Sequence, residues 1–465
     1  MNRFDDWSAR LLAAGIALTG PGVAWSQHAS PYSLGVYETV SYQPNVYQAA
    51  NGDARTSDFI SSTGLNFGVN QPFDGFSVYA NGNVQANVYQ DTKSLNNPSF
   101  AVNLGATSTA ERLGATIRYS ASQSLGDYGT PGAAATTERN TQTNQEAGVL
   151  LRYRLTPRTN LVGGIGWQSL AYSAAAFNAQ ENSSEVATLD LTHRLTPDFS
   201  AGLGLRYSNG VTPNYAAGST PGSYISDRFD GEYIDLLFSW QPGPDNTLRG
   251  RISYSRTSHT QATQLDFTGI TGGITWSYTP SERLALSAAL TQNTGSGPSL
   301  LGSPLTTSTS STGTAGSGTG SEAGTGSGSA GSSGSGSGGA AGGGSSTGST
   351  GSASGAAAGA PLTSDNNRLN TAISFGATYQ ATRTISLNGN VTFNYGDLVN
   401  ASNVTGNAWT TTIGLGLAYA PTRSITLGCQ LGTSIQSADQ SATNAGLAYS
   451  YRSPSIGCAG TMTFY

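Results

Sequence analysis

A short Thr-Pro turn between two runs of alternating residues recurs along this chain. The unit is clearest in residues 150–167, LLRYRLTPRTNLVGGIGW. Other copies turn at Thr196-Pro197, Thr279-Pro280 and Pro421-Thr422, and looser ones at Gln71-Pro72, Pro242-Gly243 and Thr382-Arg383. Alternation with a period of two places apolar side chains on one face of a strand and polar side chains on the other. Repeated this often without a competing helical pattern, it predicts a transmembrane β-barrel.

The two faces can be assigned residue by residue. In residues 147–155, one face carries Leu151 and Tyr153, and the other carries Arg152 and Arg154. A soluble β-sandwich also alternates, but its core needs large apolar side chains, whereas here the second face is rich in Asn, Thr, Ser, Gly and Arg. We therefore expect an all-β fold: one antiparallel up-and-down barrel of about eighteen strands, with sixteen as the alternative and a first strand near residues 34–47.

The N-terminus reads as a secretory signal peptide. Arg3 and Arg10 precede an apolar run that ends near Val23, and small residues lead to a cleavage site after Ser26. Residues 1–26 are thus assigned to the signal peptide and residues 27–465 to the barrel. The chain ends in an alternating strand with a terminal aromatic residue, Tyr465, as outer-membrane barrel precursors do. Both observations predict an outer-membrane protein.

Residues 294–363 interrupt the strand pattern. They consist almost entirely of Gly, Ser, Thr and Ala, with Glu322 as the only charged residue. Such a composition cannot bury a core, so we expect a disordered loop. Because the short Pro-containing turns mark the periplasmic rim, this loop and the other polar loops should be extracellular. Those other loops are expected at residues 125–145, 173–184, 209–230 and 397–407.

The chain has two cysteines, Cys429 and Cys458. They lie near the start of the penultimate strand and in the last one. If these strands pair antiparallel, the two thiols lie opposite each other, and an oxidising periplasm would join them in a disulfide. Two small cysteines that merely pack against lipid are the alternative.

Arginines dominate the charges on the face that should line the lumen. The candidates are Arg118, Arg152, Arg154, Arg194, Arg206, Arg249, Arg251 and Arg283, against few acids, chiefly Asp190 and Asp235. Most of them fall near a periplasmic turn, where they could form a basic half-ring that selects anionic solutes or polymers. Equally, arginines in a barrel wall can pair with lumen acids and only hold the wall together.

Amide side chains form a second lumen pattern. Their positions are Asn81, Asn83, Gln85 and Asn87 in one strand and Asn388, Asn390 and Asn394 in another. Amides offer donors and acceptors that match sugar hydroxyls, although any wet lumen needs polar residues.

We expect no enzyme, no cofactor and no metal site. The chain has only three histidines, His28, His193 and His259, in unrelated surroundings, and His193 is expected on the lipid side. No spacing singles out a nucleophile, a base and an orienting acid. No phosphate-binding loop or nucleic-acid signature is present, so nucleic acid is not an expected partner.

Short motifs near both ends resemble a known family. They are SYQPNVYQ at 41–48, LNFGVNQPFDGFSVYANGNVQANVYQ at 65–90, LAYAPTRSITLGCQLG at 417–432 and SIGCAGTMTFY at 455–465. They are similar to EpsL-like outer-membrane barrels of exopolysaccharide operons, within the broader β-barrel porin grouping. The resemblance implies a barrel through which a secreted polysaccharide crosses the outer membrane, docked to periplasmic export proteins.

Two other functions remain open from the sequence. One is a general diffusion porin for small polar or anionic solutes, and the other is a structural or adhesive surface barrel that carries the Gly/Ser-rich loop. In each case the surrounding partners would be outer-membrane lipid and lipopolysaccharide.

Overall fold

The computed structural model describes residues 31–108, 110, 112–217, 223–294, 367–400 and 403–464. The expected signal peptide and, apart from Thr294, the Gly/Ser-rich loop lie outside the described residues. Residues 31–464 form one compact unit.

Strands make up almost all of this unit. They are β1 (Tyr32–Gln43), β2 (Asp58–Phe73), β3 (Phe76–Tyr89), β4 (Asn97–Ser108), β5 (Leu113–Leu125), β6 (Thr141–Thr156), β7 (Thr159–Tyr172), β8 (Asn182–Arg194), β9 (Phe199–Ala217), β10 (Tyr224–Gly243), β11 (Asn246–His259), β12 (Phe267–Ser281), β13 (Leu284–Asn293), β14 (Asn367–Gln380), β15 (Ile385–Val399), β16 (Thr405–Tyr419), β17 (Ile425–Ala438) and β18 (Tyr451–Phe464). Short helical turns interrupt the loops: η1 (Lys93–Leu95), η2 (Ala175–Gln180), η3 (Thr263–Leu265) and α2 (Gln440–Asn444). No described helix is both long enough and apolar enough to cross a membrane.

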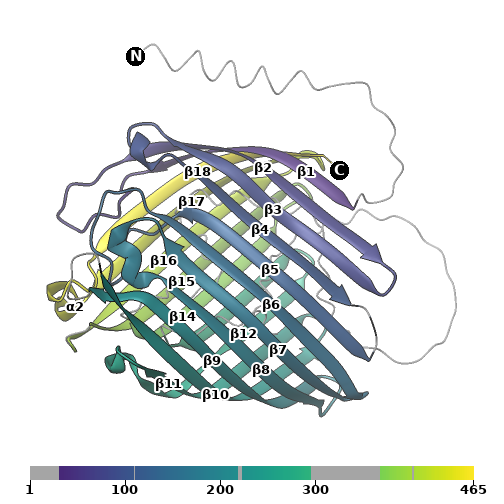
Figure 1. Ribbon diagram of the computed structural model, residues 1–465. Helices are drawn as coiled ribbons and strands as arrows, with labels where there is room; N and C mark the ends of the chain where they lie inside the picture. The colour runs from purple at the N-terminus through teal and green to yellow at the C-terminus, as the bar shows by residue number, and fades with distance from the viewer. Residues whose placement is uncertain are drawn as a thin grey trace. The chain divides into compact units, whose positions relative to one another are not determined.

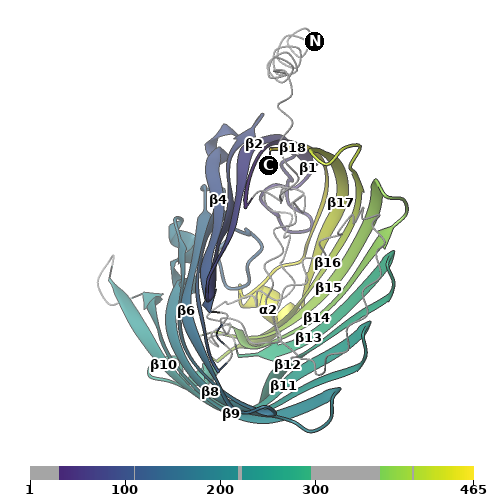
Figure 2. The same cartoon turned by 90° about the vertical axis from the view of Figure 1, so that its right-hand side faces the viewer.

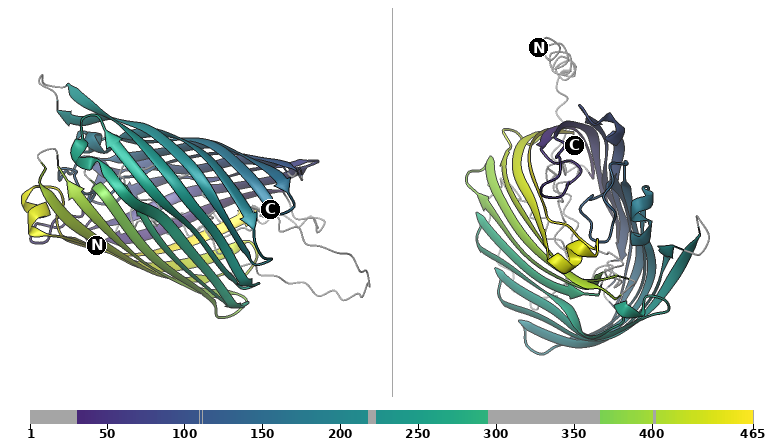
Figure 3. Two further views of the ribbon diagram at one scale, coloured as in Figure 1. Left: turned by 90° about the horizontal axis from the view of Figure 1, so that it is seen from below. Right: turned by 90° about the vertical axis from the view of Figure 1, so that its left-hand side faces the viewer.

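The strands close into one ring. Each strand pairs antiparallel with its neighbours in the chain, and β1 pairs with β18 to complete the ring, with Val40 opposite Cys458. Figure 1 and the left panel of Figure 3 show the tilted wall from the side, and Figure 2 and the right panel of Figure 3 show the ring end-on. The expectation of an eighteen-stranded up-and-down barrel is confirmed, and the alternative of sixteen is excluded.

The two ends of the barrel differ in their connections. At one end, which we call the turn end, connections are as short as residues 74–75, 157–158 and 282–283. At the other, the loop end, they run to residues 44–57 and 126–140. Strand β13 ends and strand β14 begins at the loop end.

Several expected boundaries were wrong. The loops expected at residues 125–145, 173–184 and 397–407 are shorter, at residues 126–140, 173–181 and 400–404. The first strand covers Tyr32–Gln43 instead of residues 34–47. Residues 209–230, expected as a loop, are mostly the extended ends of β9 and β10, which pair as far as Tyr224 with Ala217. Their Gly, Thr and Asn residues resemble loop composition, but pairing between neighbouring strands outweighs that weak local preference.

The alternation in sequence becomes two faces of the wall. From Arg251 to the end of β11 the burial pattern alternates, with Ile252 and Tyr254 exposed on the outside, and Arg251, Ser253 and Ser255 buried on the lumen side. Apolar side chains project outward on every strand, for example Leu203 and Leu205 on β9. The apolar groups thus cover the outside of the ring and the polar groups its interior.

Two of the loops are held by the same device. Asp58, at the loop end of β2, accepts hydrogen bonds from the backbone of Asp91 and Thr92, directly before η1. Asp227, at the loop end of β10, accepts equivalent bonds from Gln261 and Ala262, directly before η3. In each case the buried carboxylate accepts hydrogen bonds from the free N–H groups of a short helical turn. It thereby fixes the loop to the strand that precedes the two strands joined by that loop.

The two cysteines form a disulfide. Cys429 on β17 lies opposite Cys458 on β18, with a Cα–Cα distance of 4.0 Å and 29 residues between them in sequence. Both side chains are exposed on the apolar outer face of the wall. The bond therefore joins two adjacent strands on their lipid-side surface.

Candidate functional site: the lumen and its mouth

The amide ladder of β3 lies on the lumen face and is internally hydrogen-bonded. Tyr37 on β1 donates its hydroxyl to Gln85 Oε1 at 2.7 Å, and Asn83 donates to the Tyr37 oxygen at 3.2 Å. Gln85 in turn donates to Asn87 at 3.0 Å. Because these amides bind one another, they serve first to hold the wall, and only the less buried Asn81 at the start of the ladder is exposed to the lumen.

The amides of β15 lie in a different environment. Asn388 and Asn390 lie over Gly416 and Gly414 of β16, where any side chain on the glycine would clash with the amide oxygen. Asn394 follows on the same face, opposite Thr410 of β16. The glycines make room for amides that lie flat along the wall.

Two of the eight candidate arginines form a buried ion cluster. The Arg251 guanidinium lies 2.6 Å from Asp235 on β10 and 2.9 Å from Asp190 on β8. Arg206 lies 3.3 Å from the other oxygen of Asp235 and stacks on the ring of Tyr233, 3.9 Å from its centroid. These two arginines are neutralised by the wall, which favours the structural interpretation for them.

A group of arginines lies below this cluster, toward the turn end, on the lumen face of strands β6 to β11. They are Arg152, Arg154, Arg194 and Arg249, which we call the basic collar. Asp190 and Asp235, the acids that bind Arg206 and Arg251, lie further from the turn end on their strands. The collar therefore gives one side of the inner opening a positive charge.

The remaining two candidates are placed differently. Arg118 faces the lumen from β5, with Gly105 and Gly148 beside it on the neighbouring strands, so its side chain has room to extend. Arg283 lies in the exposed turn between β12 and β13. The expectation that Arg283 lines the lumen is wrong, because this residue belongs to no strand.

The loop of residues 126–140 crosses the loop end of the barrel. It leaves β5 and reaches β17, β18 and the segment between them: Gln436 donates to the Gly129 carbonyl at 3.1 Å, Tyr449 to the Tyr128 carbonyl at 2.7 Å, and Gly132 to Leu447 at 2.6 Å. The strands β1 to β4 lie between these attachment points along the wall. We call residues 126–140 the crossing loop; in Figure 2 it lies within the outline of the ring. It closes part of the mouth.

A small apolar core holds the crossing loop in place. Tyr128 packs with Phe177 of η2, Leu95 of η1 and Val46 of the first loop, and with the upper ends of β2 and β3. Sequence reasoning identified no constricting loop, because Tyr128 and Phe177 are isolated aromatics in Gly- and Ala-rich stretches. These large apolar residues, in segments whose other residues are typical of exposed loops, were the one sequence feature that could have predicted a packed loop.

Asp127 lies inside this loop cluster. Burial raises the pKa of its carboxyl group above the ordinary value, although the Gly129 N–H and the Gln48 side chain partly oppose that effect. Burial also raises the pKa of Tyr449, beside it, to about 12. Burial in this cluster thus disfavours the charged form of Asp127.

The two described histidines, His193 and His259, lie apart on different strands. His259 on β11 is buried, with its Nδ1 2.7 Å from Asp227, while His193 is exposed on the outer face and lies 2.9 Å from the Thr159 hydroxyl. His28 lies outside the described residues. The described part of the chain contains no group of three or more His, Cys, Asp or Glu side chains that could hold a metal ion.

The outer surface determines where the barrel resides. Its apolar side chains form a continuous band around a closed ring that has no unpaired strand edge. Aromatic residues lie outward near both ends of this band, including Trp240 and Tyr419 at the turn end, and Tyr207 and Trp409 at the loop end. A closed β-barrel with an apolar band and two aromatic girdles is the form in which strands cross a bacterial outer membrane. The chain is an outer-membrane β-barrel. Its turn end is periplasmic and its loop end extracellular.

Comparisons with known proteins give structural matches only. No protein-family model matches the chain, and no curated protein matches it. Among solved structures, the outer membrane protein opdK from Pseudomonas aeruginosa is similar at 12% identity, with 93% of this chain and 99% of that chain covered and a TM-score of 0.43. OccAB4 of Acinetobacter baumannii matches at 12% identity, 94% and 99% coverage and a TM-score of 0.43. OccK5 (OpdH) of Pseudomonas aeruginosa matches at 10%, 93% and 98%, with a TM-score of 0.42.

Proposed function

We propose that this barrel is a diffusion channel that admits small, negatively charged solutes across the outer membrane. The observation that carries the proposal is the basic collar on the lumen wall near the periplasmic opening. Arginines gathered on one side of the lumen raise the local concentration of anions there and repel cations.

The crossing loop supports small solutes over a polymer. It ties β5 to β17 and β18 and places a packed apolar core over the arc of β1 to β4. A polysaccharide chain needs a continuous wide path, and it would have to displace this core to pass on that side. The export function that the EpsL-like resemblance implies is therefore the less favoured candidate.

The test is ion selectivity in a planar bilayer. We expect the wild-type barrel to show a reversal potential that favours anions under a salt gradient, and the triple variant Arg152→Gln, Arg154→Gln, Arg249→Gln to lose most of that preference. The matched control removes the same charge from the outer face: Arg228→Gln, Arg256→Gln, Arg452→Gln, three arginines that are exposed there. Equal selectivity in both variants would refute the role of the collar.

Solute size separates the two candidate functions. Blocking by neutral polymers of graded length should show that short chains enter and long ones do not. A deletion strain should secrete normal amounts of surface polysaccharide. Loss of surface polymer in that strain, together with passage of long chains through the purified barrel, would instead establish export.

A further inference from the structure

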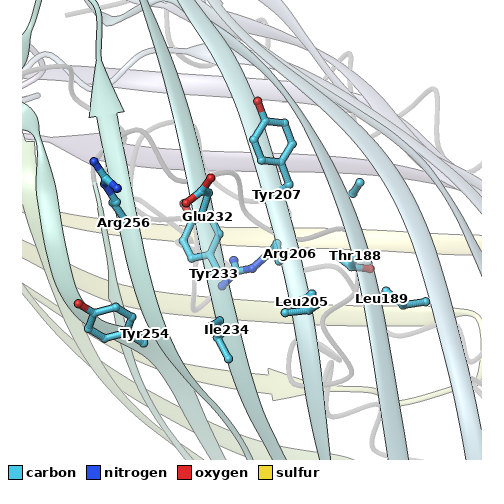
Figure 4. A pocket seen from close by; sticks show the side chains of 11 residues that line it. Thr188, Leu189, Leu205, Arg206, Tyr207, Glu232, Tyr233, Ile234, Tyr254 and Arg256 are labelled. Carbon is cyan, nitrogen blue, oxygen red and sulfur yellow. The ribbon is translucent and has the colours of Figure 1, made fainter.

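The outer face of strands β8 to β11 carries a hollow of about 470 Å³ in the middle of β8, β9 and β10, where apolar side chains of that face give way to charged ones. Side chains from all four strands border it. Ala187 on β8 is small beside Tyr207 on β9, and this difference in size leaves the space open. Figure 4 shows the hollow from close by.

Three cross-strand rows give the hollow a polarity that changes along the membrane normal. The lowest row is apolar, with Leu189 opposite Leu205 and Leu205 opposite Ile234. The middle row joins Tyr207, Glu232 and Arg256. In Figure 4 this second row lies above the first.

The uppermost row is polar and carries two carboxylates, those of Glu185 and Asp230. Glu185 pairs in register with Asn209, and Asn209 with Asp230. The Asp230 carboxylate is already bound, since it accepts a hydrogen bond from the Tyr207 hydroxyl at 2.6 Å and another from Asn209 at 3.2 Å. From the lowest row to the uppermost, the side chains therefore change from apolar to amphipathic to polar. The outer leaflet of the membrane changes in the same order, from acyl chains to headgroups.

Arg256 is the cation of this surface. It is exposed on the lipid side of β11, and within the described residues it forms no ion pair, although Glu232 lies opposite it on β10. A second exposed arginine, Arg228, lies further up β10 on the same face. A guanidinium group at the level of the lipid headgroups matches a phosphate in charge and in its paired donor geometry.

From this arrangement we infer that the hollow is a binding site for a phosphorylated glycolipid of the outer leaflet, the lipid A part of lipopolysaccharide. Its phosphate is held by Arg256 and its sugar by Tyr207 and Glu232. Its acyl chains lie on Leu205 and Ile234. This inference rests on the outer-membrane location of the barrel and not on the proposed transport function.

The experiment is a lipid titration of the purified barrel in detergent, monitored by native mass spectrometry. The probes are bisphosphorylated lipid A, its fully dephosphorylated form, and phosphatidylglycerol. We expect lipid A to bind more tightly than either of the others. Arg256→Gln should weaken lipid A binding by about tenfold, because it removes a charge-assisted hydrogen bond.

Two further variants complete the design. Ala187→Trp, which fills the hollow without removing a charge, should also weaken binding. Arg452→Gln, which removes an exposed arginine from β18 on the outer face, should not. Equal binding of dephosphorylated lipid A, or of phosphatidylglycerol, would overturn the inference. So would lipid A affinities that are unchanged in both Arg256→Gln and Ala187→Trp.

Discussion

Arg251 on β11 binds Asp190 on β8 across the two strands that lie between them. The guanidinium Nη2 and the carboxylate Oδ2 are 2.9 Å apart, and both side chains are buried. The contact is possible because Gly204 on β9 has no side chain: a Cβ there would lie 2.2 Å from the other Asp190 oxygen. One glycine thus allows an ion cluster to extend over four strands of the wall.

Removing Arg251 should destabilise the barrel strongly. Arg251→Gln leaves two buried carboxylates with Arg206 as their nearest cation, and breaking a buried pair in this way costs about 3 kcal/mol. The measurement is the urea concentration at which half of the barrel is unfolded. Folded and unfolded barrel are separated by their different mobilities in electrophoresis. Arg256→Gln, on the same strand but the opposite face, is the matched control and should leave the midpoint unchanged. A similar midpoint for both variants would show that the cluster does not contribute to stability.

Gly204→Ala should weaken the same cluster without changing any charge. The new methyl group must displace the Asp190 carboxylate, and overpacking of this kind costs about 1 to 3 kcal/mol. Gly163→Ala on β7 provides the comparison, because the nearest atom to its added Cβ is 3.9 Å away. The urea midpoint of Gly204→Ala should therefore fall below that of Gly163→Ala, and the reverse order would contradict the steric argument.

The disulfide should stabilise the closing strands. Replacing Cys429 and Cys458 by serine removes a cross-link that spans 29 residues, for which we expect a loss of about 3 kcal/mol. The barrel should still fold, since β17 and β18 remain fully paired. Thiol labelling of the unfolded wild-type protein under non-reducing conditions checks the bond itself: two reactive thiols per chain would show that it is absent in the cell.

Much of the wall could be predicted from the sequence, because each strand carries its own alternation. The faces of β3, β6 and β15 and the opposition of Cys429 and Cys458 follow from local spacing alone. Strand number followed from counting these units. The extended ends of β9 and β10 could not be predicted in this way, because a Gly- and Asn-rich strand and a loop have the same local composition.

Contacts between distant segments were beyond this reasoning. Alternation places Arg206 and Arg251 in the lumen, but only the ring brings Asp190 and Asp235 within reach of them. The crossing loop meets the segment between β17 and β18 through residues more than 300 positions apart, as Tyr449 and Tyr128 show. Asp58 and Asp227 each precede a Gln-Pro turn by a similar number of residues. This spacing is a signal in the sequence, but only the structure shows that both carboxylates accept hydrogen bonds from a loop.

Gly129 should control the position of the crossing loop. A Cβ at this residue would lie 2.3 Å from the Tyr451 ring, which is fully buried, so Gly129→Ala must move the loop away from β18. We expect a larger single-channel conductance and easier passage of neutral polymers, because part of the mouth opens. Ala135→Val adds atoms at an exposed position of the same loop and should change neither property. An unaltered conductance in Gly129→Ala would mean that the loop does not limit the pore.

Asp127 should make the packing of that loop depend on pH. Burial raises the pKa of this carboxyl group in the folded state, so the folded loop holds a proton more tightly than the unfolded loop does. Its packing is therefore most stable below the ordinary pKa of aspartate and weakens as pH rises through the raised value. Tyr449 and Tyr128 stay neutral over this range, since burial raises the pKa of each to about 12.

Hydrogen exchange of residues 126–140, corrected for the intrinsic effect of pH on exchange, measures this dependence. In the wild type, protection should fall as the pH rises above the ordinary pKa of aspartate and through the raised pKa of Asp127. In Asp127→Asn it should stay high and nearly constant, because the amide still accepts the Gly129 N–H at 2.9 Å but carries no charge at any pH. Conductance should follow the same order, with the wild-type channel more open at the higher pH. A decline of the same size in Asp127→Asn would assign the effect to another group.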